Sequence, residues 1–289
     1  MHAQGFWSGA ALRLIGAART HVVLGDTDVL LHRLGPERGE PWVLLHGLGS
    51  TAGSWMPLLS TLRRDCRLLL PELSEIGGTA APSAGLNAQQ GARLMAKLIE
   101  RESPGRPVTL AGTSLGGWMA VLLALERPDL VERLVLIDPG GYRDQDWEQI
   151  ARVMTVNRPQ DVDDLYLALF RRPPALLRLS RWSFYRTYTS EAVRSVLAST
   201  TESHVFDDGD LARIAAPTAL IWGEHDGIFS AEAGRAMARA LPQGEFYLLP
   251  ECGHVAHWEQ VRPTLAALRD FRLRFPGSAS PAAESARAS

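Results

Sequence analysis

The stretch VTLAGTSLGGWMAVLLALE, residues Val108–Glu126, decides the fold that this sequence predicts. Its first part, Val108–Ala111, is an apolar run with the length and residue types of a buried strand, and Trp118–Glu126 is apolar all round, as in a buried helix. Between them lies the motif Gly-x-Ser-x-Gly, with Ser114 at its centre. A turn from strand to helix at such a motif is tight enough to hold the serine in a strained, exposed conformation.

The motif by itself is a weak signal, because short patterns of this kind recur by chance. An inert serine in a glycine-rich turn is therefore the alternative to a nucleophile. The apolar strand directly before the motif and the helix directly after it favour the nucleophile, because that is the context in which such a serine works. Ser114 is accordingly the predicted nucleophile.

Outside this stretch, short β-rich runs alternate with longer helical stretches, which is typical of an α/β fold with helices on both faces of a mostly parallel sheet. Two early runs separated by GDTD predict an antiparallel hairpin. Asn87, with Gln90 three residues later, predicts the capped start of a helix. The expected strands are His21–Leu24, Val29–Arg33, Trp42–Leu45, Arg67–Leu70, Val108–Ala111, Leu134–Ile137, Thr218–Trp222 and Glu245–Leu249.

One segment interrupts the alternation. From Tyr142 to His204 the chain shows helical patterns and proline-rich joints but no strand-like run, which predicts a helical cap inserted over the edge of the sheet. The expected division is an N-terminal arm (1–19), a core (20–141 and 205–275), the cap (142–204) and a disordered tail (276–289), which is small and polar.

The composition excludes several classes of function. With 30 basic and 32 acidic residues the formal net charge is −2, and no basic block or aromatic-and-basic stripe is present, so we expect no nucleic-acid partner. The two cysteines, Cys66 and Cys252, are far apart and have no metal-ligand spacing. This pattern favours a reduced, cytoplasmic setting over a disulfide framework or a structural metal site.

The N-terminal stretch Gly5–Ala18 is apolar with a single arginine. It lacks the basic flank of a signal peptide, and it is shorter than the ~18 to 20 apolar residues that span a membrane. We expect a short helix or arm packed on the core, and we favour this over a helix that lies on a membrane surface.

A nucleophilic serine needs a base, and the base needs an orienting carboxylate. His254 follows the last expected strand and Asp226 follows the strand before it, so both lie at the edge where open α/β sheets place their sites. The order serine, aspartate, histidine along the chain is the one in which this kind of triad occurs. We therefore predict Ser114, Asp226 and His254 as the catalytic residues.

Three other residues are rivals for these roles. His225 and His257 share loops with the preferred residues, but neither has the strand-end glycine beside it, so both are expected to be local hydrogen-bonders. Asp138, in LVLIDPGG after the preceding strand, is the main rival for the acid.

A loop upstream supplies the expected oxyanion hole. HGLG, residues 46–49, ends the first wholly apolar strand and is placed to fold back over the nucleophile. The donors would be the backbone N–H groups of Leu48 and of Leu115, the residue after the nucleophile. His46 is expected to be a structural hydrogen-bonder and not a base.

Four motifs now stand in register: LLHGLG, GTSLGG, IWGEHD and CGHVAHWE. Together they resemble the α/β-hydrolase superfamily over about residues 20–275. The resemblance implies the α/β-hydrolase fold, a doubly wound sheet with a cap, and, because the elbow carries serine and not aspartate, acyl transfer. No nucleotide or metal motif is present, so no cofactor is expected.

A narrower resemblance comes from the cap segments NRPQDVDDLYLALF and SFYRTY and the strand ending in IWG. These look like bacterial lipases and esterases related to monoacylglycerol lipases. The chain departs from those relatives at Pro71–Thr79, where PELSEIGGT stands in place of a PDLPGxGxS-like loop. Because this loop borders the site, the departure bears on substrate selectivity and not on the triad.

The cap is rich in aromatic residues and leucines, most of which pack its helices together. Collectively they favour an apolar acyl or alcohol group, with Trp182 and Phe184 as the expected substrate contacts. The expected function is hydrolysis of carboxylic esters of small molecules through an acyl-enzyme. Two alternatives stay open: a C–C bond hydrolase or acyltransferase with the same triad, and a non-catalytic relative that binds a small ligand.

Overall fold

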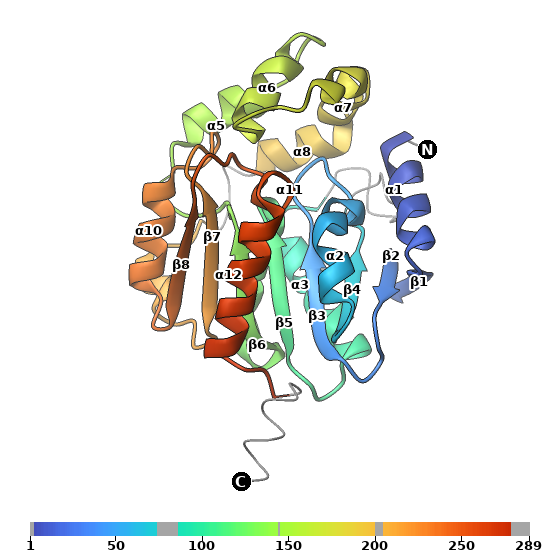
Figure 1. Cartoon of the computed structure of the whole chain (residues 1–289), viewed down its shortest axis with the longest axis vertical. Coiled ribbons are helices and arrows are strands. Elements are labelled where there is room, and N and C mark those ends of the chain that lie inside the picture. Colours follow the sequence, from blue (N-terminus) through green and yellow to red (C-terminus); the bar gives the residue numbers. More distant parts are fainter. Residues whose placement is uncertain (1–2, 74–85, 144, 200–204, 279–289) are drawn as a thin grey trace.

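Eight strands form one sheet in the computed structural model, which describes residues 3–73, 86–143, 145–199 and 205–278 (Figure 1). Their order across the sheet is β1-β2-β4-β3-β5-β6-β7-β8. The strand β2 pairs antiparallel with β1 and β4, and the other neighbours are parallel, so the predicted hairpin and parallel sheet are confirmed. The strands are β1 (Ala18–Leu24), β2 (Thr27–Leu34), β3 (Glu40–Leu45), β4 (Cys66–Pro71), β5 (Val108–Thr113), β6 (Val131–Ile137), β7 (Thr218–Gly223) and β8 (Gly244–Leu249).

Helices cover both faces of this sheet, so the central strands β3, β5 and β7 are buried along their whole length. One apolar core lies between the sheet and α3 (Ala88–Glu102), α4 (Leu115–Glu126) and α10 (Ala231–Ala240). A second core lies on the other face, under α2 (Met56–Leu62) and α12 (Val261–Arg274). Burial on both faces explains why these strands are continuous apolar runs and not alternating ones.

Two local sequence signals act as predicted. The side chain of Asn87 accepts a hydrogen bond from the N–H of Gln90 at 2.9 Å, and Gln90 accepts one from the N–H of Asn87 at 3.1 Å. This capping box starts α3 because it satisfies two N–H groups that have no acceptor inside the helix. The apolar helix α4 is buried on nearly all sides.

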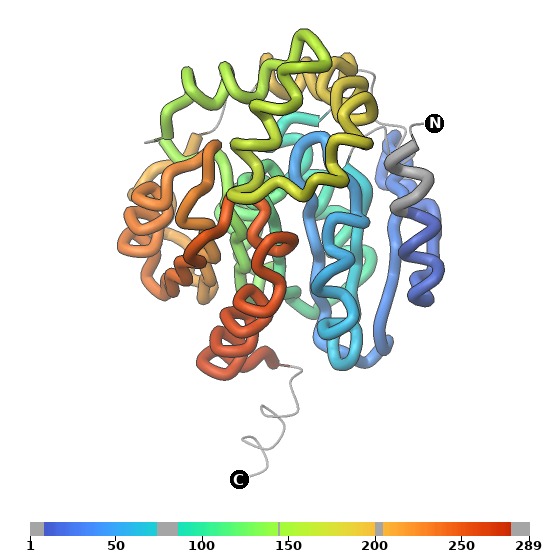
Figure 2. The backbone as a smooth tube through the Cα atoms, turned by 45° about the horizontal axis from the view of Figure 1, so that its top comes forward, coloured from blue at the N-terminus to red at the C-terminus, as the bar shows by residue number. Residues whose placement is uncertain are grey.

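The segment between β6 and β7 is helical and lies above the carboxyl edge of the sheet, at the top of Figures 1 and 2. Its positions 144 and 200–204 are outside the described residues. The elements there are α5 (Trp147–Met154), α6 (Asp161–Leu169), η4 (Ala175–Ser180), α7 (Arg181–Tyr188) and α8 (Glu191–Ser199), followed by α9 (Asp208–Leu211) before β7.

At the N-terminus, α1 (Ala3–Leu14) lies beside the sheet, and its Leu12 is fully buried in the second core. Among the described residues, no helix is both long and apolar enough to cross a membrane. Most of the expected disordered tail, residues 279–289, lies outside the described residues.

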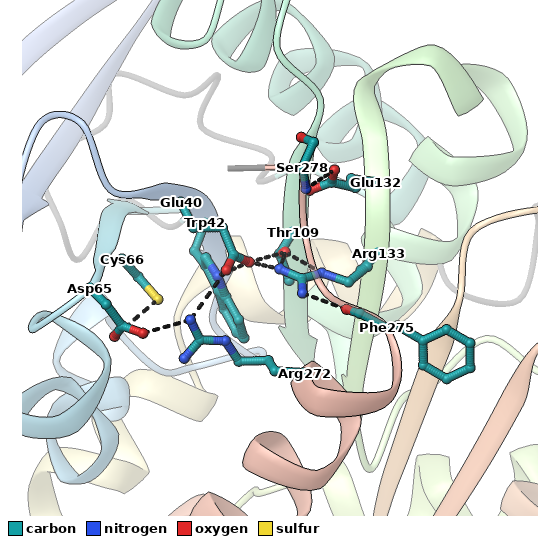
Figure 3. A network of polar contacts seen from close by, with 10 residues as sticks. All are labelled: Glu40, Trp42, Asp65, Cys66, Thr109, Glu132, Arg133, Arg272, Phe275 and Ser278. Carbon is teal, nitrogen blue, oxygen red and sulfur yellow. Dashed lines mark hydrogen bonds and ion pairs between the residues drawn. The ribbon is translucent and has the colours of Figure 1, made fainter. Parts of the chain in front are cut away.

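A buried ion-pair network holds the opposite, amino-terminal end of the sheet (Figure 3). Arg133 on β6 directly contacts the carboxylate of Glu40 on β3, and each is only 2% exposed. Arg272 on α12 reaches the same carboxylate at 3.2 Å and also Asp65 at 2.7 Å. Burial, and then the positive charge of Arg272, lowers the pKa of Arg133 to about 10. The network therefore joins β3, β6 and α12 through one carboxylate shared by two guanidinium groups, of which Arg272 also pairs with Asp65.

Candidate active site

The turn between β5 and α4 has the geometry expected of a nucleophile elbow. Ser114 lies in it with φ 54° and ψ −119°, a backbone conformation that residues other than glycine rarely adopt. A Cβ atom on Gly112 would collide with the carbonyl oxygen of Gly116, and one on Gly116 would collide with that of Leu45. The two glycines of the motif are thus required by close backbone approach, and the strain at Ser114 is held by the packed strand and helix on either side.

The predicted base and acid are in contact. His254 follows β8 and Asp226 follows β7, and Nδ1 of His254 lies 2.8 Å from Oδ2 of Asp226. The other carboxylate oxygen, Oδ1, accepts backbone N–H bonds from Ile228 at 2.8 Å and Phe229 at 3.0 Å. These bonds fix the carboxylate, and a carboxylate at Nδ1 keeps the hydrogen there and leaves Nε2 free to accept a proton.

The surroundings of His254 exclude water from this pair. The side chains of His254 and Asp226 are 3% and 0% exposed. The ring of Phe229 packs edge-on against the imidazole, with 5.3 Å between the ring centroids. Ser114 and His254 both line one cavity. The structure therefore brings together the nucleophile, base and acid that the sequence predicts.

The expected oxyanion donors belong to two segments that meet at Ser114: a Cβ atom on Gly47, next to Leu48, would lie 3.2 Å from the Cβ atom of Ser114. Leu48 lines the cavity, and Leu115 is the first residue of α4, where a backbone N–H has no acceptor within the helix. Tyr188, from the helical segment above the sheet, packs on this loop: its hydroxyl lies 3.4 Å from the carbonyl oxygen of Leu48, and its ring lies against Gly49. The sequence does not single out Tyr188, because its close contact with a glycine of HGLG joins segments far apart in the chain.

A buried charged cluster supports the same loop. Nε2 of His46 accepts a hydrogen bond from the N–H of Leu73 at 3.0 Å, and Glu72 accepts one from the N–H of Ala52 at 3.1 Å. Burial alone would raise the pKa of Glu72, but the imidazoles of His32 and His46, whose Nε2 atoms lie 3.6 and 3.5 Å from its carboxylate oxygens, hold it at about 2. His46 is thus a structural hydrogen-bonder, as predicted. The sequence singles out the loop that begins at Pro71, but it does not predict this role of Glu72. Residues 74–79 of the loop lie outside the described residues.

Of the two rival histidines, His257 lines the cavity at Ser114 and His225 does not. His225 is 39% exposed, near the carboxylates of Glu224 and Glu251. His257 is buried, its ring centroid is 5.4 Å from that of Trp55, and its nitrogens have no hydrogen-bond partner among the described residues. Burial, and then the charge of His254, lowers the pKa of His257 to about 3. The prediction that His257 is a local hydrogen-bonder is wrong, because the turn into α11 (Ala256–Glu259) directs its ring onto an apolar wall.

The cavity at Ser114 has a volume of about 1040 Å³. Its wall is mostly apolar and includes Met56, Met154, Leu169, Leu177, Phe184 and Ile228. Of the two expected substrate contacts, Phe184 lines the cavity. Trp182 does not: it is 62% exposed and stacks on Tyr185 on the outer side of α7.

The sequence model described as "Alpha/beta hydrolase family" matches residues 42–267. The 2-hydroxy-6-oxononadienedioate/2-hydroxy-6-oxononatrienedioate hydrolase of Cupriavidus pinatubonensis is 27% identical over 214 residues, 65% of this chain and 70% of that protein. Lipase 3 of a Moraxella species is 23% identical over 220 residues, 71% of this chain and 69% of that protein. The crystal structure of a bacterial membrane phospholipase A has a TM-score of 0.81 at 23% identity, covers 93% of each chain, and shows a shared fold.

Proposed function

We propose that this chain, which belongs to the alpha/beta hydrolase family, is a serine hydrolase that cleaves carboxylic esters with an apolar acyl or alcohol group. The observation that carries the proposal is the apolar cavity of about 1040 Å³ that opens onto Ser114 and His254.

The chemistry follows from the placement of the groups. Oγ of Ser114 attacks the ester carbonyl carbon while Nε2 of His254 accepts its proton, and Asp226 stabilises the imidazolium that forms. The N–H groups of Leu48 and Leu115 stabilise the oxyanion of the tetrahedral intermediate. His254 then returns the proton to the departing alcohol, which leaves an acyl-enzyme on Ser114. Water, activated by the same histidine, attacks the acyl carbon and releases the acid.

The cavity wall favours an apolar substrate. Each methylene group that moves from water into an apolar pocket contributes about 0.8 kcal/mol, whereas a polar group buried without a partner costs several kcal/mol. Side chains such as Leu177 and Met154 offer only dispersion contacts to what they surround. A hydrocarbon chain gains free energy along this wall, and an ionised group loses it.

The relatives named for 2-hydroxy-6-oxononadienedioate raise C–C bond hydrolysis as the rival activity. A dioate carries two carboxylates, which need cationic or hydrogen-bonding partners when they are buried. Of the described residues that line the cavity, none is lysine or arginine. The sequence of 74–85, 144 and 200–204 contains none either. The lack of a lysine or arginine in the described part of the wall therefore supports an uncharged ester over a dioate as the substrate.

The experiment compares kcat/KM for two esters, p-nitrophenyl butyrate and p-nitrophenyl octanoate, with kcat/KM for 2-hydroxy-6-oxononadienedioate, the diketone for which the relatives are named. We expect the esters to be preferred by at least about 100-fold, in line with the cost of burying an unpaired carboxylate. A diketone with an alkyl group in place of the distal carboxylate is the control for charge. Preference for either diketone over both esters would assign C–C bond cleavage instead.

A further inference from the structure

Asp138, the rival acid, has an unusual environment at the end of β6. It is fully buried and has φ 45°, in the left-handed region. Its Oδ1 accepts a hydrogen bond from the N–H of Gly223 at 2.8 Å. Its Oδ2 has no hydrogen-bond donor among the described residues. A buried carboxylate oxygen without a donor is costly, so this side chain needs an explanation.

Asp138 is also close to the catalytic pair. One ligand-type atom from each of Asp138, Asp226 and His254 lies within 4.8 Å of the other two. Two carboxyl groups are thus side by side in a buried site, and two such groups cannot both be ionised at low cost.

The hydrogen bonds decide which carboxyl carries the proton. Asp226 accepts two backbone N–H bonds at Oδ1 and has the imidazole of His254 at Oδ2. Those donors favour its ionised form. Asp138 has burial and a neighbouring negative charge: burial, and then the charge of Asp226, raises the pKa of Asp138 well above its ordinary value, and nearby backbone N–H groups oppose this only in part.

We propose that Asp138 is held as a neutral carboxylic acid whose O–H donates a hydrogen bond to the carboxylate of Asp226, which makes Asp138 a positioning residue for the catalytic pair. Asp138 touches no substrate; it acts through Asp226 on His254. Its proton removes the second negative charge from the site, and its hydrogen bond orients the carboxylate toward the imidazole. The role rests on the proposed function in one respect, that Asp226 and His254 serve Ser114.

The titratable groups that face Asp138 are Asp226, His254 and Cys252. Burial raises the pKa of the Cys252 thiol, so this group stays neutral.

The test is Asp138→Asn, followed by the rate of Ser114 labelling by a fluorophosphonate probe as a function of pH. Asparagine is neutral, tolerates positive φ, accepts from Gly223 and donates to Asp226. If Asp138 is already neutral, the midpoint of the acid limb moves by less than ~0.5 pH unit and the rate stays within about threefold of wild type. If Asp138 is ionised, removing a charge about 5 Å from the imidazole moves the midpoint roughly two units to lower pH. That shift would overturn the proposal.

Asp138→Leu, which has no donor, is the second variant. We expect labelling and kcat to fall about tenfold with KM unchanged, because one hydrogen bond to a charged group is lost. A leucine variant with wild-type rates would overturn the proposal; if leucine prevents folding, the acid limb of Asp138→Asn still decides. EDTA should change no rate in wild type, and loss of labelling in EDTA would overturn it in favour of a cation at this cluster.

Probe labelling requires the serine and its base but no particular substrate. Wild type that is labelled but turns over no ester contradicts the proposed function and leaves the role of Asp138 to be read from the pH profile. If wild type turns over esters but the acid-limb midpoint of Asp138→Asn moves by two pH units, the result contradicts only the role of Asp138.

Discussion

Nδ1 of His254 lies 2.8 Å from Oδ2 of Asp226, and neither side chain has more than 3% of its surface exposed. Among the described residues, Glu72 lies near the buried His46 and Asp138 lies beside this pair, but only Asp226 combines contact with His254 and backbone hydrogen bonds from Ile228 and Phe229. This contact makes the two residues act as one unit, since a buried charge separated from its partner is costly.

The first prediction concerns this pair. Asp226→Asn should lower kcat by at least ~10³-fold, because an amide no longer holds the imidazole in the tautomer with a free Nε2. The matched control is Asp138→Asn, a substitution of the same kind in the adjacent carboxyl, which should stay within about threefold of wild type. The measurement is kcat for p-nitrophenyl butyrate. A larger loss in Asp138→Asn than in Asp226→Asn would exchange the two roles.

The strands and the elbow could be predicted from sequence because their signals are local. Apolar runs such as Thr218–Trp222 need burial on both faces, and Gly112 is required by backbone contact within its own turn, whereas Gly116 is required by contact with Leu45 on β3. Ser114, Asp226 and His254 each follow a parallel strand. Because parallel strands end at the same edge of a sheet, all three residues lie at its carboxyl edge.

Orientation on a helix face was not predictable. In SFYRTY the polar residues Ser183 and Thr187 share one helix face, yet Ser183 lines the cavity and Thr187 is buried, so polarity does not separate the inner from the outer side of α7. In the structure Phe184 and Tyr188, four residues apart, stack on the inner side, with ring centroids 6.3 Å apart. Trp182 and Tyr185, three apart, stack on the outer side. Tertiary packing around the cavity therefore decides which aromatic residues of α7 face inward.

The second prediction uses these two faces. Phe184→Ala should flatten the rise of log(kcat/KM) with acyl chain length, which in wild type is at most about fourfold per methylene. Trp182→Ala is the matched control and should leave the slope unchanged. The measurement is kcat/KM for p-nitrophenyl esters from acetate to decanoate. Equal slopes in wild type and Phe184→Ala would show that this side chain only packs the helices.

The third prediction concerns Glu72, whose folded pKa is about 2 against an ordinary value of 4.5. A depressed pKa means that the folded state binds fewer protons, so Glu72 stabilises the fold above pH ~4.5 and loses this as pH falls toward 2. Glu72→Gln should therefore lower the free energy of unfolding by roughly 2–3 kcal/mol at pH 7 and by much less at pH 3. Urea unfolding at both pH values measures it, with exposed Glu148→Gln as control. An equal loss at both pH values would contradict the charged cluster.

The fourth prediction concerns the network of Figure 3. Glu40→Gln removes the charge that pairs with Arg133 and Arg272 and should destabilise the fold by about 3–5 kcal/mol, because Arg133 stays buried. Glu148→Gln, which breaks the exposed pair with Arg152, should cost less than about 1 kcal/mol. Thermal unfolding of both variants gives the comparison. Similar costs would mean that the buried network adds no more than a surface pair.

The measurement that tests the central claim most directly is the mass of the peptide containing Ser114 after brief reaction with p-nitrophenyl butyrate and acid quench. An acyl-enzyme mechanism predicts that this peptide gains one butyryl group in wild type and none in Ser114→Ala, whose turnover should fall by at least ~10³-fold. Butyryl transfer to another residue, or undiminished ester turnover by Ser114→Ala, would contradict the assignment of Ser114 as the nucleophile of an ester hydrolase.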